Sequence, residues 1–465
     1  MLGGLRRTRL FGHRRFGHRR LAAVAACLTL ALPIIPAITE PALSATTPRF
    51  TDGAGLQVRA VTPIDDRDYN VSVLSPYLGR PVNIRILLPS NYDPTSATRY
   101  PVLYLFHGTS GYASDWINAG GAEQTTANLN LITVMPDCGF NGDGGFWFTN
   151  WVDQTTSHGP SQFEDYLIKS LIPWVDMNLN TIPNRDGRAV AGLSQGGYGS
   201  AEMAARYPDL FVSMATFSGA PEIERDPEVF AGAIGVIEAI EVGEDRVPPF
   251  SELGNPATDL INWEGHDPTT LITNLRGMSI DMWTGEGIDG PYDPTPNPEG
   301  SAIEMAVYES TEHFHEHLVA DGIKSYYDDY VYGTHSFPYW ARDLSAYVPR
   351  MMQDFAHPKS PPTISYMSID KNWSQWGYDV SMNRTAAQEF SSLTDGTVSG
   401  FDFSGSGTAT ITTPDQYASG STVNVTISGP QGKKTEQIAV GPDGRVTMEV
   451  PLGSGGQAHV TISAG

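Results

Sequence analysis

The sequence predicts an α/β domain with a mostly parallel, doubly wound sheet, followed by a smaller all-β domain. From about residue 63 to 356, short β-rich runs alternate with helical patterns. Such alternation requires crossover connections, and these give parallel strands with helices on both faces. After a proline-rich linker at 357–364 the pattern changes to alternating strands with frequent turn signals. The chain is therefore expected to fold as two domains, 63–356 and 365–465.

In the first domain the expected strands are short runs of apolar and β-branched residues, bounded by turn residues. They cover 82–88, 102–106, 131–135, 188–193, 212–217, 279–284 and 326–332. Helical patterns cover 163–178, 200–206 and 310–320. In open parallel sheets, ligands bind at the carboxyl ends of strands, so functional residues are expected in the loops that follow these runs.

The second domain is expected to be a β-sandwich of about one hundred residues. Its strands are predicted at 408–413, 422–428, 437–440, 446–450 and 459–463, separated by glycine- and proline-containing turns. It contains no catalytic constellation. Packing on the first domain or contact with envelope glycans are the two roles left open for it.

Residues 1–45 have the pattern of an export signal. Seven arginines precede an apolar stretch at 21–37, which Pro33 and Pro36 interrupt, and small residues follow at 42–45. A retained membrane anchor is the alternative. Residues 46–62 are expected to be a linker. Cys138 would be the one cysteine left after cleavage, so no intramolecular disulfide is expected.

The charge balance argues against nucleic acid as a partner. The chain has a formal charge of −23, and without residues 1–45, which hold seven arginines and one glutamate, it would be −29. A surface this acidic repels phosphate backbones and anionic membranes.

The most informative motif is Gly192-x-Ser194-x-Gly196, which lies between the strand at 188–193 and a helical pattern. This is the context of a nucleophile elbow, in which a sharp turn exposes the serine of an α/β-hydrolase. A serine hydroxyl needs a histidine to remove its proton and an acid to orient that histidine. The motif predicts a serine nucleophile at Ser194.

In this fold class the order along the chain is serine, acid, histidine. His335 follows the last expected strand in a glycine-containing loop, which is the position expected of the base. For the acid, Glu286 and Asp289 lie in the loop after 279–284, and Glu304 lies further on. The residues alone leave these three open, with Glu286 preferred.

The histidines at 313, 315 and 317 also suggest a metal site, since 313 and 317 are one helical turn apart. No third ligand is implied by the sequence, and the spacing is not that of a zinc protease motif. A solvated helix face is the better interpretation, and no metal or organic cofactor is expected.

An oxyanion hole requires two backbone N–H donors. One is expected at Gln195, directly after the nucleophile, and the other at Thr109, in the turn after 102–106. His107 in the same turn is interpreted as a structural residue. The aromatic residues at 146–148 and Trp151 are candidates for an acyl pocket, with ordinary loop packing as the alternative.

Several segments between about 70 and 350 resemble the secreted mycolyltransferases of mycolate-bearing actinobacteria, within the broader esterase D-like group. They are Leu74-Ser75-Pro76-Tyr77-Leu78-Gly79-Arg80, Trp263 with Asp267-Pro268-Thr269, Gly333-Thr334-His335-Ser336 with Tyr339-Trp340, and the elbow with its spacing. The resemblance implies Ser194 as nucleophile, His335 as base and Glu304 as acid. It thereby replaces Glu286 as the preferred acid.

The chain also departs from that family. Members that acylate trehalose carry Asp-Gly-Leu-Arg where this chain has His107-Gly108-Thr109-Ser110. Gln195-Gly196-Gly197 replaces Met-Ala-Gly, and Phe337 replaces a tryptophan. The expected function is that of a secreted acyl-ester enzyme, which passes the acyl group of a lipid ester to a sugar hydroxyl or to water. The alternative that is not an enzyme is a surface adhesin built on a hydrolase scaffold.

Overall fold

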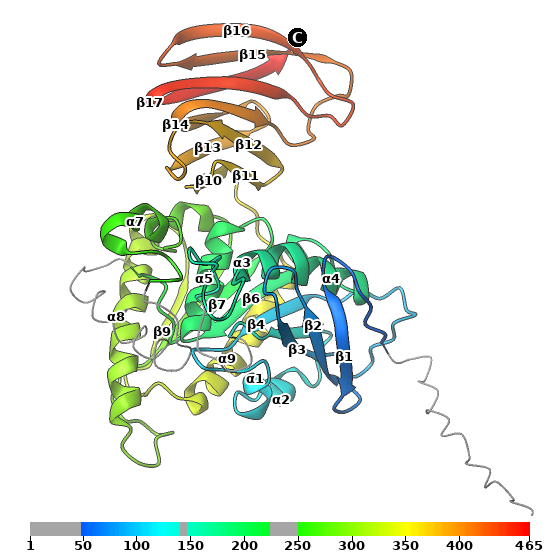
Figure 1. The fold of residues 1–465 in the computed structure, drawn as a ribbon, viewed down its shortest axis with the longest axis vertical. Coiled ribbons are helices and arrows are strands. Elements are labelled where there is room, and N and C mark those ends of the chain that lie inside the picture. Colours follow the sequence, from blue (N-terminus) through cyan, green and yellow to red (C-terminus); the bar gives the residue numbers. More distant parts are fainter. Residues whose placement is uncertain (1–47, 140–146, 224–249) are drawn as a thin grey trace, which may run out of the picture. The chain divides into compact units, whose positions relative to one another are not determined.

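The computed structural model describes residues 48–139, 147–223 and 250–465 (Figure 1). The expected export signal, its cleavage site and Phe146 lie outside these residues. A nine-stranded sheet forms the first domain, in the order β1-β2-β3-β5-β4-β6-β7-β8-β9. All strand pairs from β5 to β9 along this order are parallel, and the pairs that involve β1, β2 and β3 are antiparallel. The prediction of a mostly parallel sheet is confirmed.

The strands of this sheet are β1 (Gln57–Pro63), β2 (Asp68–Leu74), β3 (Pro81–Leu87), β4 (Val102–Phe106), β5 (Ile132–Pro136), β6 (Arg188–Leu193), β7 (Ser213–Phe217), β8 (Ser279–Thr284) and β9 (Tyr326–Asp329). The seven expected strands are present within a few residues. β1 and β2 were not predicted, and β1 occupies part of the segment 46–62 that was expected to be a linker. Because β1 is an edge strand whose residues are almost all exposed, it has no apolar alternation that would indicate a strand.

The helices and helical turns cover both faces of the sheet. They are α1 (Asp115–Asn118), α2 (Ala122–Thr126), α3 (Phe163–Asp165), η1 (Tyr166–Leu171), α4 (Ile172–Asn178), η2 (Arg185–Gly187), α5 (Gln195–Arg206), α7 (Pro256–Glu264), η3 (Ile272–Leu275), α8 (Pro298–Ala320) and α9 (Phe337–Ala356). The helix expected at 163–178 is present, but its middle part, η1, is a π-helix. Pro173, at the start of α4, has no N–H to donate to the preceding turn, and the wider π-turn lies directly before it.

Alternate residues of the central strands belong to two different cores. On β4, Val102, Tyr104 and Phe106 pack with helices α4 and α5, whereas Leu103 and Leu105 pack with Trp116 and with α9. This period of two puts one apolar core on each face, as expected for strands buried on both sides. The doubly wound arrangement is therefore present.

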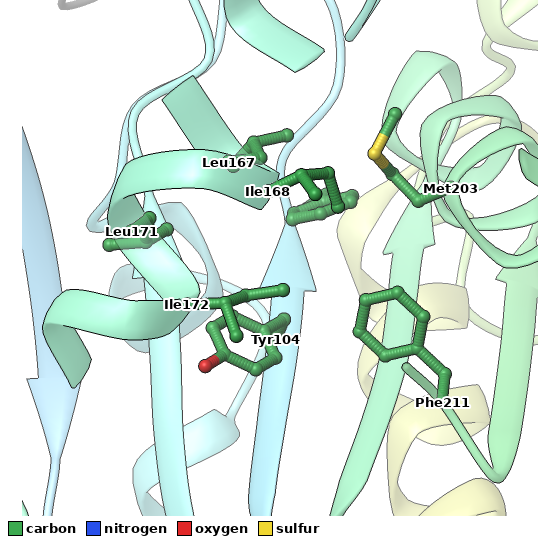
Figure 2. A pocket seen from close by; sticks show the side chains of 8 residues that line it. Tyr104, Leu167, Ile168, Leu171, Ile172, Met203 and Phe211 are labelled. Carbon is green, nitrogen blue, oxygen red and sulfur yellow. The ribbon is translucent and has the colours of Figure 1, made fainter. Parts of the chain in front are cut away.

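A small apolar cavity lies in the first of these cores, between β4, the η1–α4 helix and α5. Figure 2 shows Leu167, Ile168, Leu171 and Ile172 facing Tyr104, Met203 and Phe211 around it. Its volume is about 10 Å³, which is about the minimum for one water molecule. The cavity is a packing defect and has no room for a substrate.

The C-terminal region is all β, as expected. It contains β10 (Ile364–Ser368), β11 (Asn372–Gln375), β12 (Tyr378–Asn383), β13 (Ser391–Thr397), β14 (Gly400–Thr412), β15 (Thr422–Gly429), β16 (Gly432–Ala439) and β17 (Thr447–Ala464). These eight strands pair as one antiparallel sheet, whereas a sandwich was expected to have two separate sheets. The runs 446–450 and 459–463 are parts of the single long strand β17, which continues through its glycines with register shifts opposite Gly405 and Gly407.

Residues at the start of this sheet hydrogen-bond to the first domain. The Asn274 side chain pairs with the Met367 backbone in both directions, at 2.8 and 2.9 Å. Tyr366 donates to the Arg206 carbonyl at 2.9 Å, and the Arg206 guanidinium lies 3.1 Å from Asp370. These hydrogen bonds join the C-terminal region to the first domain, which is the first of the two alternatives considered for it. In the described parts of the chain, none of the helices combines the length and apolarity needed to cross a bilayer.

Candidate active site

Ser194 lies in the sharp turn between β6 and α5. Its backbone has φ 53° and ψ −125°, a strained conformation for a residue other than glycine. A Cβ on Gly192 would lie 2.2 Å from the Gly196 carbonyl oxygen, and a Cβ on Gly196 would lie 2.3 Å from the His107 carbonyl oxygen. Only glycine fits at both positions. The structure therefore forms the elbow that the motif predicted, with the serine at the carboxyl end of a central strand.

The histidine expected to be the base contacts one of the three candidate acids. His335 lies in the loop between β9 and α9, and its Nδ1 is 2.7 Å from Oε2 of Glu304 on α8. The Glu304 side chain is fully buried, and that of His335 is 9% exposed. Since a carboxylate can only accept, Nδ1 carries the proton and Nε2 has a free lone pair. Within the described residues Nε2 is buried and has no hydrogen-bond partner.

Three donors hold the other oxygen of Glu304. Ser218 donates to Oε1 at 2.7 Å, the Gly285 amide at 2.8 Å and Thr284 at 3.2 Å. The indole of Trp340 in turn donates to the Ser218 hydroxyl at 3.0 Å. These hydrogen bonds supply donors to Oε1 of the buried carboxylate, and Oε2 is left to accept from the imidazole.

The other two candidate acids lie elsewhere in the structure. Asp289 is exposed and accepts from the Asn297 amide at 3.3 Å, and the Glu286 amide donates to Val331. Neither side chain contacts His335 among the described residues. The initial preference for Glu286 is therefore not supported, because the carboxylate that pairs with the imidazole is the buried Glu304 on α8, as the family resemblance implied.

Asp293, which the sequence analysis did not single out, holds the His335 loop. It accepts from the Thr334 hydroxyl at 2.5 Å, the Tyr339 hydroxyl at 2.6 Å and the Gly290 amide at 2.8 Å. Although partial burial opposes its charge, the hydrogen bonds from Thr334 and Tyr339 lower the pKa of Asp293. The loop is thus tied on both sides of the imidazole.

The turn after β4 passes directly beside the nucleophile. A Cβ on Gly108 would lie 3.1 Å from the Ser194 Cβ and 2.8 Å from the Leu193 side chain. His107 donates from Nδ1 to the Gly108 carbonyl at 2.7 Å and accepts the Cys138 amide at Nε2 at 2.9 Å. Both ring nitrogens of His107 are hydrogen-bonded to backbone groups, which is what we expect of a structural residue.

The aromatic residues proposed for an acyl pocket are largely packed into the protein. Phe148 stacks on Phe106 with ring centroids 4.7 Å apart, and Trp147 meets Tyr198 edge-on at 5.0 Å. Trp147, Phe148 and Trp151 are all buried. These contacts favour the alternative of ordinary loop packing.

Asp343, two turns into α9, makes stability depend on pH. Burial raises its pKa to about 8, although Arg342 opposes the shift. An unfolded aspartate titrates near 3.9, so this group contributes stability that is fully present below about pH 4 and is lost as the pH rises through about 8. We expect the Tm of the wild-type protein to decrease from pH 6 to pH 9. In the Asp343→Asn variant the decrease in Tm over the same interval should be smaller by about 2 °C or more. Thermal unfolding at the two pH values measures this, and equal falls would contradict it.

Comparisons with known proteins identify the family of the α/β domain. The family model described as "Putative esterase" matches residues 75–351, which include the elbow, Glu304 and His335. The chain belongs to this esterase family. The match covers the α/β domain and ends before the C-terminal β-sheet.

Curated relatives of this chain include the esterase Rv1288 of Mycobacterium tuberculosis, which is 32% identical over 276 residues. The alignment covers 59% of this chain and 57% of that protein, so the chain spans little more than half the length of this relative. The diacylglycerol acyltransferase/mycolyltransferase Ag85C of Mycobacterium avium is 26% identical over 228 residues, covering 48% of this chain and 61% of that protein. Among solved structures, Mycobacterium tuberculosis MPT51 is 24% identical, with a TM-score of 0.49, and the match covers 62% of this chain and 99% of that one.

Proposed function

We propose that this protein is an exported serine enzyme that cleaves acyl esters through an acyl-enzyme intermediate. The observation that carries the proposal is the 2.7 Å contact between His335 Nδ1 and the buried Glu304, in a domain whose strained elbow presents Ser194. Membership in the esterase family supports an ester as the substrate. Export rests on residues 1–45, whose sequence has the pattern of a signal peptide.

In the proposed mechanism, Nε2 of His335 takes the Ser194 proton while Oγ attacks the ester carbonyl. The amides of Gln195 and Thr109 donate to the oxyanion of the tetrahedral intermediate. When this intermediate collapses, the proton on Nε2 passes to the leaving alcohol, and the acyl group stays on Oγ. Glu304 stays ionised throughout and stabilises the imidazolium.

The acyl-enzyme is then resolved by a hydroxyl, which His335 deprotonates in the same way. A sugar hydroxyl gives an acyltransferase, and water gives an esterase. The turn His107-Gly108-Thr109-Ser110 has lost the two charged residues found in family members that acylate trehalose. Since His107 is also engaged with backbone on both ring nitrogens, this turn offers fewer free polar groups to a sugar, which favours water or a different acceptor.

The experiment that tests the proposal follows the acyl group. The purified protein is incubated with a long-chain acyl-trehalose ester and excess free trehalose, with Ser194→Ala as the control, and mass spectrometry identifies the products. We expect free fatty acid as the main product and a transient acyl adduct on the peptide that contains Ser194. Diacylated trehalose as the main product would establish a transferase with this acceptor and overturn the preference for water. No turnover and no adduct with this or shorter acyl esters would overturn the enzyme assignment itself.

A further inference from the structure

The histidine pair on α8 has a third partner that the sequence did not indicate. His313 and His317 lie one turn apart on this helix, and Glu222 comes from the segment that follows β7. His313 Nδ1 is 2.9 Å from Oε2 and 3.2 Å from Oε1 of Glu222. The rings of His313 and His317 meet at a centroid distance of 5.7 Å. Two imidazoles and one carboxylate therefore face one another.

The spacing of the donor atoms suits a small metal ion. One ligand atom from each of the three side chains lies within 4.8 Å of the other two. Around a tetrahedral zinc ion with bonds of about 2.0–2.1 Å, two ligand atoms are separated by about 3.3 Å. The His313–Glu222 pair is within a few tenths of an ångström of that separation, and the exposed His317 has to move closer to complete the set.

The backbone that carries Glu222 is fixed to the helix that carries the histidines. The Glu222 amide donates to the Ser310 hydroxyl at 3.0 Å, and this hydroxyl donates to the Glu222 carbonyl at 2.9 Å. One residue further along α8, Thr311 donates to the Gly219 carbonyl at 3.1 Å. Ser310 is three residues before His313 and lies on the same face of the helix. The backbone segments that carry the three ligands are thus held together, so binding requires ordering mainly of the His317 side chain.

The site is also accessible. The Glu222 side chain is 7% exposed and that of His313 is 30% exposed, while His317 is exposed. Within the described residues, His317 makes no hydrogen bond, so its ring nitrogens are available. An ion can approach from solvent and keep a water molecule at its fourth position, as in three-ligand zinc sites.

We propose that Glu222, His313 and His317 bind a divalent transition-metal ion of the zinc class. Two imidazole nitrogens favour zinc and its neighbours over magnesium and calcium, which prefer oxygen ligands. Binding through Nδ1 requires the proton that His313 shares with Glu222 to leave this nitrogen, and in the neutral imidazole Nε2 takes up a proton in its place. The ion joins α8, which carries Glu304, to the segment after β7, which carries Ser218. It therefore stabilises the folded state.

His315 provides a matched control on the same helix. Its Nδ1 is 3.1 Å from the Ser325 hydroxyl, and its ring lies 4.6 Å from that of Tyr327. It is two residues from both members of the pair and points to a different side of the helix. Substituting it removes a histidine from α8 without removing a ligand from the site.

The test compares zinc binding by wild-type protein and the variants His313→Gln, His317→Gln and His315→Gln, after chelator treatment and dialysis. In calorimetric titration with Zn²⁺, we expect the first two variants to lose at least about tenfold in affinity and His315→Gln to bind like wild type. Zn²⁺ should also raise the Tm of wild type and His315→Gln, but not that of His317→Gln, and Mg²⁺ should have no effect.

Other zinc-binding groups of the chain, including His335, are the same in all four proteins, so the difference between them reports this site alone. Because His317 is exposed, we expect the His317→Gln variant to fold, and it remains interpretable if His313→Gln is unstable. Equal binding by His317→Gln and His315→Gln, or no binding by wild type at about 100 μM Zn²⁺, would overturn the proposal.

Discussion

Ser194→Ala is expected to abolish covalent labelling by a fluorophosphonate probe and to lower ester turnover by about 10⁴-fold or more. The reason is that the probe and the substrate react with the same atom, the Oγ that the elbow presents at the end of β6. Alanine keeps the backbone geometry and removes only this atom. Labelling of the intact protein, detected by fluorescence after electrophoresis and by mass, measures the effect.

Ser200→Ala is a suitable control, because Ser200 lies on the same helix but its hydroxyl is buried and donates to the Gly197 and Ala215 carbonyls. This variant should label like the wild type. If Ser194→Ala still labels, another residue is the nucleophile. If the wild type does not label either, the protein is not a serine enzyme and the adhesin interpretation gains support.

The second large effect is expected from Glu304→Gln, which should lower turnover by about 10³- to 10⁴-fold. Ser218 and the Gly285 amide donate to one carboxylate oxygen, so the glutamine must place its carbonyl there and its NH₂ group toward His335. Nδ1 would then have to accept a hydrogen bond, and the proton of the neutral imidazole would move to Nε2. In this tautomer the imidazole cannot take the Ser194 proton.

Glu286→Gln and Asp289→Asn test the specificity of this result. Both residues follow β8, both were candidates from the sequence, and neither contacts His335 among the described residues. Turnover should change by no more than a few fold in either variant. Steady-state kinetics, with thermal unfolding to show that each variant is folded, measures the effect, and a larger loss in Glu286→Gln than in Glu304→Gln would reassign the acid.

Much of the first domain could be predicted from local patterns. The central strands are fully buried runs with clear boundaries, and β6 was predicted to the residue. The edge strand β1 was missed because its residues face solvent. The C-terminal sheet was predicted as β structure, but strand pairing depends on contacts between residues far apart in the chain, so two predicted runs became the single strand β17.

The sequence by itself determined the position of the elbow, because the clashes that exclude side chains at Gly192 and Gly196 are set by a tight local turn and by the strand beside it. It also predicted that His335 follows the last strand of the sheet, and His335 lies in the loop between β9 and α9. The family resemblance implied Glu304 as the acid, but the residues alone did not separate it from Glu286 and Asp289. The contact of Glu304 with His335 and that of Glu222 with His313, across 91 residues, appear only in the tertiary structure. The number of residues between two positions does not determine whether their side chains meet in the folded protein. These contacts depend on how α8 packs against the carboxyl ends of β7 and β8, and this packing is a property of the whole fold.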